Sequence, residues 1–250
     1  MRPPVIPATV SLSITFLSLF VSTTGAAADA QLPAFDPLDF DGAATADNRY
    51  FPLAPGQRQL VASFAGSQET EFERSVINTL DSGPRIFGVN TITFVDQDFE
   101  NDRLVEETRD FFAQDINGNV WYFGESVTNF IYDSSGNLVD TNKESSWLAG
   151  VNGSLPGQIM PADPVVGDAY FQEFSKANEA MDEGKVHAVG VTLQVGDRTY
   201  DDVLVVLETT TLDADAREFK YYAPGVGLVR IEEDLDTDLG NPELVFDLVR

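Results

Sequence analysis

Residues 111–125 read FFAQDINGNVWYFGE, and this stretch predicts two strands joined by a tight turn. Aromatic and apolar residues on both sides of the turn are of the types that favour strands. The step Asn117-Gly118 between them is typical of a hairpin turn, because glycine and asparagine adopt positive φ at low cost. A looser copy of the turn follows at residues 133–138. The pattern therefore predicts a meander of antiparallel strands.

Outward from this hairpin, the same alternation of apolar runs and turn residues continues. Further strands are predicted at 86–94, 104–114, 186–195, 199–209, 219–222, 226–231 and 244–249. One helix is predicted at 171–182, because Phe171, Phe174 and Ala177 have helical spacing before Gly184. Helices between parallel strands are missing, which excludes a Rossmann-type fold. We predict an all-β fold with one short helix, built as a curved antiparallel meander sheet or a half-open barrel.

The N-terminus has the layout of a secretory signal peptide. Arg2 gives a positive start, residues 8–21 are uncharged and largely apolar, and Ala28-Asp29-Ala30 fits the small-residue cleavage pattern. A membrane anchor is the alternative, but a spanning helix needs about 20 apolar residues. We expect a signal peptide over 1–30, no transmembrane segment after its removal, and a secreted or periplasmic protein. A loop-like N-terminal arm over 31–58 and a single β-rich domain over 59–250 complete the predicted organisation.

The composition is strongly acidic and contains no cysteine. The chain has 41 acidic and 15 basic side chains, a net charge of −26. Such a surface repels phosphate backbones, so nucleic acid is not an expected partner. Without cysteine the fold depends on burial alone, and a lipid anchor on cysteine is excluded. Two interpretations of the acidity stay open: a surface suited to a salty environment, or the binding of divalent cations.

Four blocks of sequence carry a resemblance to a known group. They are FPLAPG at 51–56, FFAQDINGNVWYFGE at 111–125, GVNGSLPGQIMPADPVVGDAY at 150–170 and KYYAPGVGLVRI at 220–231. In this order they resemble a widespread group of uncharacterised exported bacterial β-rich proteins. The resemblance implies a single domain of that group, and it brings no activity and no catalytic residue. In architecture alone, the expected sheet is also similar to those of periplasmic lipoprotein carriers and other lipid-handling proteins.

Signatures of enzymes are weak in this chain. The single histidine, His187, stands in a predicted strand, where a structural role is expected. Ser154 lacks the flanking glycines of a nucleophile elbow, because Asn152 and Pro156 occupy those positions. No catalytic residue is predicted. Paired carboxylates that face each other across a cleft would still permit glycoside hydrolysis.

Two acidic clusters are candidates for calcium. Asp234, Asp236 and Asp238 alternate in the way that calcium loops supply hard oxygen ligands, although Leu239 stands where an EF-hand needs glycine. A second cluster consists of Asp96, Asp98, Glu100 and Asp102. If its backbone is extended, these carboxylates share one face and repel each other unless they are screened or bridged by a cation. The alternative for both clusters is a solvated acidic hairpin end.

Aromatic side chains of the central strands are the candidate ligand-binding residues: Trp121, Phe123, Phe130 and Tyr132. In a closed fold such residues form core, whereas in a half-open barrel they line an apolar pocket. The favoured hypothesis is an exported non-enzymatic binding protein that holds a small apolar ligand or lipid in the curved sheet. One alternative is a calcium-stabilised structural or interaction module with an envelope or extracellular protein as partner. The other is a carboxylate-dependent hydrolase.

Overall fold

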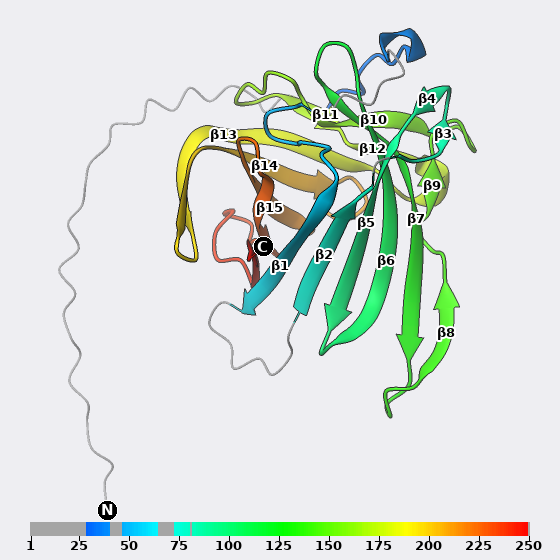
Figure 1. Cartoon of the computed structure of the whole chain (residues 1–250), viewed down its shortest axis with the longest axis vertical. Helices are drawn as coiled ribbons and strands as arrows, with labels where there is room; N and C mark the ends of the chain where they lie inside the picture. The colour runs from blue at the N-terminus through cyan, green and yellow to red at the C-terminus, as the bar shows by residue number, and fades with distance from the viewer. Residues whose placement is uncertain (1–28, 41–46, 65–72, 81, 250) are drawn as a thin grey trace, which may run out of the picture.

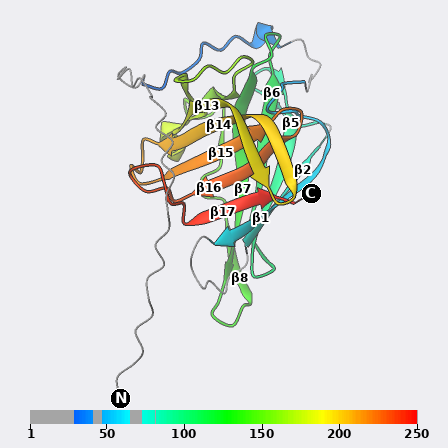
Figure 2. The same cartoon turned by 90° about the vertical axis from the view of Figure 1, so that its left-hand side faces the viewer.

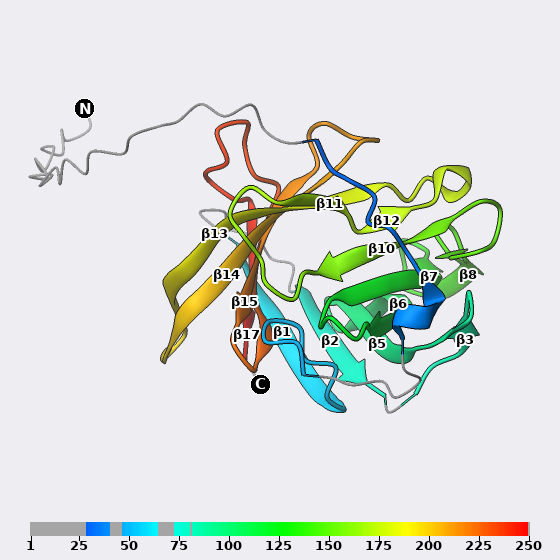
Figure 3. The same cartoon turned by 90° about the horizontal axis from the view of Figure 1, so that it is seen from above.

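The computed structural model describes residues 29–40, 47–64, 73–80 and 82–249. Of the predicted signal peptide only residues 29 and 30 lie among them. In these residues thirteen strands follow one another in a single antiparallel sheet, which curls into a nearly closed barrel (Figures 1 and 3). The predicted all-β fold and half-open barrel are confirmed. None of the described helices is long and apolar enough to cross a membrane.

Two meanders form the walls of the barrel. The first wall contains β1 (Gly56–Phe64), β2 (Glu73–Thr79), β5 (Ile92–Glu100), β6 (Arg103–Gln114) and β7 (Val120–Tyr132). The second wall contains β13 (Asp182–Val195), β14 (Arg198–Thr210), β15 (Arg217–Ala223), β16 (Gly227–Glu233) and β17 (Leu244–Leu248). Figure 2 shows the second wall and the place where β17 lies beside β1. That pairing, with Leu60 opposite Leu248, joins the two walls on one side.

On the other side the barrel is nearly closed, at a seam where β11 (Ala169–Phe171) and β12 (Glu173–Phe174) do not pair with each other. β11 pairs with β13, whereas β12 pairs with β10 (Leu155–Met160), which itself pairs with β7. A single residue, Gln172, connects β11 to β12. The chain thus crosses from one edge of the sheet to the other within six residues (Figure 3).

Short elements surround this frame. β8 (Leu138–Asn142) and β9 (Trp147–Leu148) pair with β7, and β3 (Arg85–Ile86) pairs with β4 (Val89–Asn90). Two 3-10 turns complete the described elements, η1 (Pro37–Asp39) and η2 (Lys176–Asn178). Asn101 and Asp102 adopt positive φ in the tight turn that joins β5 to β6.

Two local predictions are wrong. Residues 171–182 form no α-helix but strand ends and the turn η2, because Phe171 and Phe174 pack edge to face at 5.2 Å while the backbone around them pairs with β13 and β10. Residues 86–94 are not one strand. Phe87 and Gly88, at φ of 48° and 91°, turn the chain between β3 and β4 before β5 begins.

The alternation of side chains along each strand creates an inner and an outer core. On β7, Tyr122 faces the lumen and stacks on Phe112 at 4.8 Å. Trp121 and Phe123 therefore face outward. There they pack beneath Phe35 and Phe40 of the N-terminal segment, with ring centroids 5.6 to 6.2 Å apart.

Candidate functional site: an acidic barrel lumen

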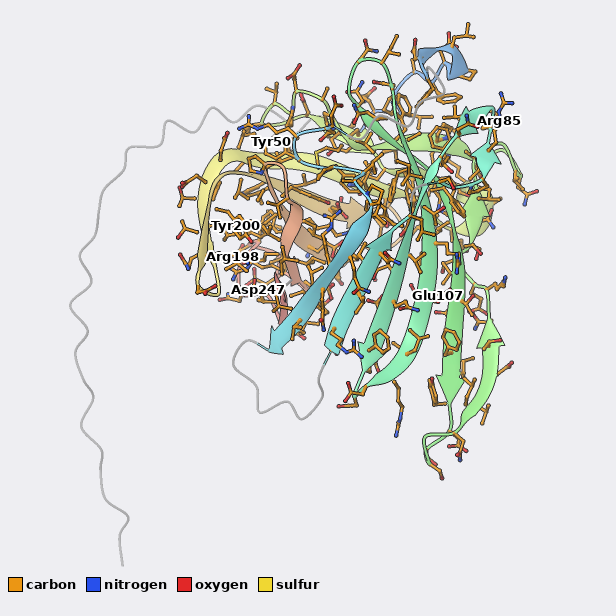
Figure 4. All side chains as sticks on the ribbon, in the orientation of Figure 1. Tyr50, Arg85, Glu107, Arg198, Tyr200 and Asp247 are labelled. Carbon is orange, nitrogen blue, oxygen red and sulfur yellow. The ribbon has the colours of Figure 1, made fainter. Side chains whose placement is uncertain are left out.

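A cavity of about 270 Å³ lies in the lumen, between the two walls. Side chains from both walls occupy much of the space between the ribbons (Figure 4). One part of the lining is aromatic and comprises Phe51, Phe94, Phe112, Tyr122 and Tyr222. Branched aliphatic side chains, such as Leu228 and Ile231, lie beside these rings. This part of the cavity offers an apolar contact surface.

The rest of the lining is acidic. The carboxylates at the cavity are Asp96, Asp98, Glu106, Asp110, Glu173, Asp182 and Glu208, and the basic side chains there are Arg58 and Lys220. Strand alternation explains the arrangement. Asp96 and Asp98 follow Phe94 at two-residue intervals on β5, so all three side chains face the lumen. Two further hollows share residues with the cavity and add Glu218 and Glu233 to the acidic lining.

Asp110 and Glu125 meet at the hydroxyl of Tyr122. The Tyr122 oxygen lies 2.5 Å from Asp110 Oδ1 and 3.1 Å from Glu125 Oε2. Burial raises the pKa of Asp110 to about 7 and that of Glu125 to about 8, and their mutual repulsion adds to the shift of Glu125. One phenol carries a single proton, so two such bonds require a second donor. A protonated Glu125 supplies it, and near neutral pH this carboxyl is largely uncharged.

Other lumen carboxyls are shifted in the same direction. Burial, with repulsion from Asp96 and Glu106, raises the pKa of Asp98 to about 8. Burial also raises the pKa of Glu173 well above its usual range, although Trp147 Nε1 donates to its carboxylate at 3.2 Å. The cause is common to these groups: a concave sheet gathers carboxylates that water solvates poorly.

Lys220 is the cation at the centre of this lining. Its ammonium lies 2.6 Å from Glu208 and 2.9 Å from Glu218. Burial alone would lower the pKa of Lys220, but the two carboxylates raise it well above the ordinary value. Glu208 also accepts a hydrogen bond of 2.8 Å from Gln172 Nε2, which ties the closing strand to the same group. Arg58, by contrast, donates to the backbone of Val226.

Two buried hydroxyls on the inner face have no hydrogen-bond partner among the described residues: those of Thr79 and Tyr170. Thr79 stands opposite Phe94, whose ring lines the cavity. The Tyr170 ring lies over Gly184, where a Cβ would stand 2.8 Å from the ring and 2.9 Å from the Gln172 amide. Gly184 pairs directly with Glu208, so the Tyr170 hydroxyl belongs to the lumen side of the second wall.

The aromatic residues singled out from sequence lie on the outer face of β7. Trp121 donates to Asp115 at 2.9 Å, and the Tyr132 hydroxyl donates to the Leu104 carbonyl at 2.9 Å. By the register of β6 and β7, Phe123 and Phe130 share that face. None of Trp121, Phe123, Phe130 and Tyr132 is among the residues that line the lumen cavity.

The predicted calcium ligands do not converge. In the loop after β16, Asp236 accepts hydrogen bonds from the amides of Asp238 and Gly240 and from the Asn241 side chain, and these bonds lower its pKa. Asp234 and Asp238 are exposed. Nowhere in the described parts of the chain do three or more acidic, histidine or cysteine side chains stand close enough to hold a metal ion.

The second acidic cluster divides between lumen and solvent. A solvated hairpin end is wrong for Asp96 and Asp98, because β5 runs on to Glu100 and keeps both side chains within the barrel. Glu100 and Asp102 are exposed, as expected of a hairpin end. The predicted shared face of the extended strand thus points into the barrel at Asp96 and Asp98, which are half-buried.

His187 and Ser154, the two residues considered for catalysis, each have a structural contact. His187 packs on Phe219 at 4.6 Å, and burial lowers its pKa. Ser154 is buried, and its hydroxyl is bonded to that of Ser175 at 2.7 Å. Neither contact supplies the nucleophile and base that hydrolysis by a serine requires.

The functional residues that sequence reasoning missed are the inward carboxyls outside the β5 cluster. They include Asp110, Glu125 and Glu173. The available signal was an acid at a position two residues from an inward aromatic, such as Asp110 before Phe112. That signal is useful only once the inward face is known.

No family model matches this chain, and no curated protein matches it. Among solved structures, the chain is similar to a protein of Bacteroides fragilis described as exported and as having a YmcC-like fold. The two are 10% identical, the match covers 81% of this chain and 98% of that one, and the TM-score is 0.38. It is also similar to a protein of Parabacteroides distasonis described as a lipoprotein, at 11% identity, 81% and 97% coverage and a TM-score of 0.35.

Both similar structures come from bacterial proteins, one described as exported and the other as a lipoprotein. At this level of likeness no activity and no residue role transfers to this chain.

Proposed function

We propose that this chain is an exported, non-enzymatic binding protein that holds a small ligand inside the barrel. The observation that carries the proposal is the lumen cavity of about 270 Å³, whose aromatic part joins Phe94 and Phe112 of one wall to Tyr222 of the other. Binding sites for small molecules are concave and largely apolar, with a few polar groups that fix orientation. This cavity has both kinds of lining.

A hydrolase is less well supported than a binding protein. Enzymes that cleave glycosides with two carboxyl groups need one protonated acid and one ionised partner, so their surroundings shift the two pKa values apart. Here burial raises the pKa of Asp98, Asp110, Glu125 and Glu173 alike. Raised pKa values throughout the set favour the protonated acid over the ionised partner.

The test is native mass spectrometry of residues 31–250, exported by a bacterial host and never refolded. We expect an adduct of a few hundred daltons on the wild-type chain. Leu228→Trp narrows the cavity, because Leu228 is a partly buried lining residue, and should lose the adduct. Leu212→Trp adds the same ring at a position that is 55% exposed, and should keep it.

An adduct retained by the Leu228→Trp protein would place the ligand outside the lumen and contradict the proposal. So would a bare polypeptide mass from wild-type protein that is purified at low concentration of salt and detergent.

A further inference from the structure

We propose that the lumen binds an organic polyamine, with its ammonium groups held by the inward carboxylates and its methylene segments against the aromatic rings. This inference rests on the proposed function and specifies the chemical class of its ligand. Three independent features of the lumen support it: the distribution of charge, the mode in which Lys220 is held, and unpartnered hydroxyls on the inner face.

The distribution of charge favours an extended cation over a metal ion. The cavity is lined by seven carboxylates and two basic side chains. These carboxylates come from β5, β6, β12, β13 and β14, so they are spread around the wall. Among the described residues no three of them gather as a metal site would require. Several separated positive charges on one flexible chain match that spacing.

The contacts of Lys220 show how the lumen holds an alkylammonium group. The Lys220 side chain is an alkyl chain that ends in an ammonium, and the ammonium lies between Glu208 and Glu218 at 2.6 and 2.9 Å. Asp98, Asp110 and Glu173 face the same cavity and form no ion pair with a described residue. An amine ligand would give these carboxyls the partner that Glu208 and Glu218 have.

The Tyr170 hydroxyl is a buried polar group on the lumen side of the second wall, next to the cavity-lining Gln172 although not itself among the lining residues. The residue is 4% exposed, its hydroxyl has no hydrogen-bond partner among the described residues, and its ring lies on the lumen side above Gly184. A buried hydroxyl that stays unpaired costs free energy. An ammonium N–H is a donor that the phenol oxygen can accept, and the faces of Phe112 and Tyr222 attract cations as well.

Spermidine is the probe, and proton release is the decisive readout. Lumen carboxyls with raised pKa values carry protons near neutral pH, and a bound ammonium favours their ionised form. Binding in the lumen therefore releases protons, whereas binding to exposed, already ionised carboxylates does not. We would titrate residues 31–250 with spermidine at about 0.15 M salt, where long-range surface attraction is screened. Calorimetry in two buffers of different ionisation enthalpy gives the number of protons released.

The variant Asp110→Asn/Glu125→Gln replaces two ionisable inward carboxyls with amides and keeps the shapes of both side chains. Its stability should equal or exceed that of the wild type, because both groups are costly to ionise where they lie. We expect spermidine affinity to fall about tenfold or more and the proton release to shrink. Glu144→Gln, at an exposed carboxylate, is the control and should change neither quantity.

Three outcomes overturn the inference. Spermidine that binds without proton release, and equally to both variants, is bound to the outer surface. A wild-type protein that ignores spermidine but carries an adduct that Leu228→Trp removes has a lumen ligand of another class, so the proposed function survives and the amine does not. If spermidine is ignored and no adduct is found, both fail.

Discussion

Lys220 compensates part of the negative charge in the lumen. Its ammonium is shared by Glu208 and Glu218, and Gln172 donates to the same Glu208. Removal of one partner from a buried ion pair leaves the other charge uncompensated, which costs more than the pair itself contributes. Because burial raises the pKa of Glu218 to about 7, the effect of a substitution at Lys220 must depend on pH.

We expect Lys220→Met to lower the free energy of unfolding by about 3 kcal/mol near pH 8, because Glu208 and Glu218 lose their shared cation. The loss should be smaller near pH 5, because burial raises the pKa of Glu218 to about 7 and a protonated carboxyl needs no cation. Urea unfolding at the two pH values measures the difference. Addition of Glu208→Gln to the variant should recover part of the stability near pH 8, and a loss that is equal at both pH values would contradict this account.

At the residue scale, sequence could predict the alternation of faces but not which face is the inner one. The run Val120–Phe123 is apolar at every position, and so Trp121 and Tyr122 are equivalent candidates for the lumen until the curvature is known. For the same reason Asp96 was indistinguishable from a solvated acid. Its burial depends on β6, which extends for 12 residues beside it and carries Thr108 and Glu106 to the same face.

At the element scale, the close approach of β10 to the strands at the seam depends on one residue, Gly157. Its Cα faces the backbone of the closing strand, and a Cβ there would collide with the carbonyl of Gln172. Because the obstacle is backbone, it cannot rotate out of the way as a side chain would. The close approach of β10 to residues 171–172 is available to glycine alone.

Gly157→Ala should therefore separate β10 from the closing strand and lower the free energy of unfolding by about 2 kcal/mol. Hydrogen exchange should quicken in β10, β11 and β12 and stay unchanged in β15 and β16. Gly240→Ala is the matched control, because the nearest atom to its Cβ would be an Asp236 oxygen 3.9 Å away. Equal exchange rates in wild type and Gly157→Ala would contradict the role given to this contact.

At the element scale, most strands were predictable because each is paired to a neighbour in sequence by a short turn. One of the wrong predictions, the helix at residues 171–182, is informative. Residues 171–182 have an apolar spacing that suits a helix, yet the chain there is extended because both edges of the sheet need a partner. That demand arises from partner residues 12 to 19 positions away in sequence, beyond the reach of a local helical pattern. Tertiary pairing overrides the local preference.

The pH dependence of stability belongs to the whole barrel. Four lumen carboxyls have pKa values raised to about 7 (Asp110, Glu218) or about 8 (Asp98, Glu125), against about 4 in an unfolded chain. The folded state thus binds more protons than the unfolded state between these values. A raised carboxyl pKa stabilises fully below the unfolded value, and the contribution is lost as the pH rises through the folded value.

We expect the free energy of unfolding to fall between about pH 5 and about pH 8 and to level off above that range. Surface repulsion in a chain of net charge −26 acts in the same direction, but added salt screens it. A series at about 0.5 M salt isolates the lumen contribution. Asp110→Asn/Glu125→Gln should flatten the profile, whereas Glu144→Gln should not. A wild-type profile already flat at high salt would show that the lumen carboxyls ionise normally.

The contact between β1 and β17 has a consequence for the order in which the barrel is completed. Leu60 lies opposite Leu248, 188 positions later in the chain. Whether it leaves a ribosome or a translocation channel, β1 emerges well before β17, and it presents one unpaired edge until β17 arrives. Contacts so distant in sequence form slowly, and an open edge invites pairing with another chain. The arrival of β17 thus ends the period in which the edge of β1 is open to aggregation.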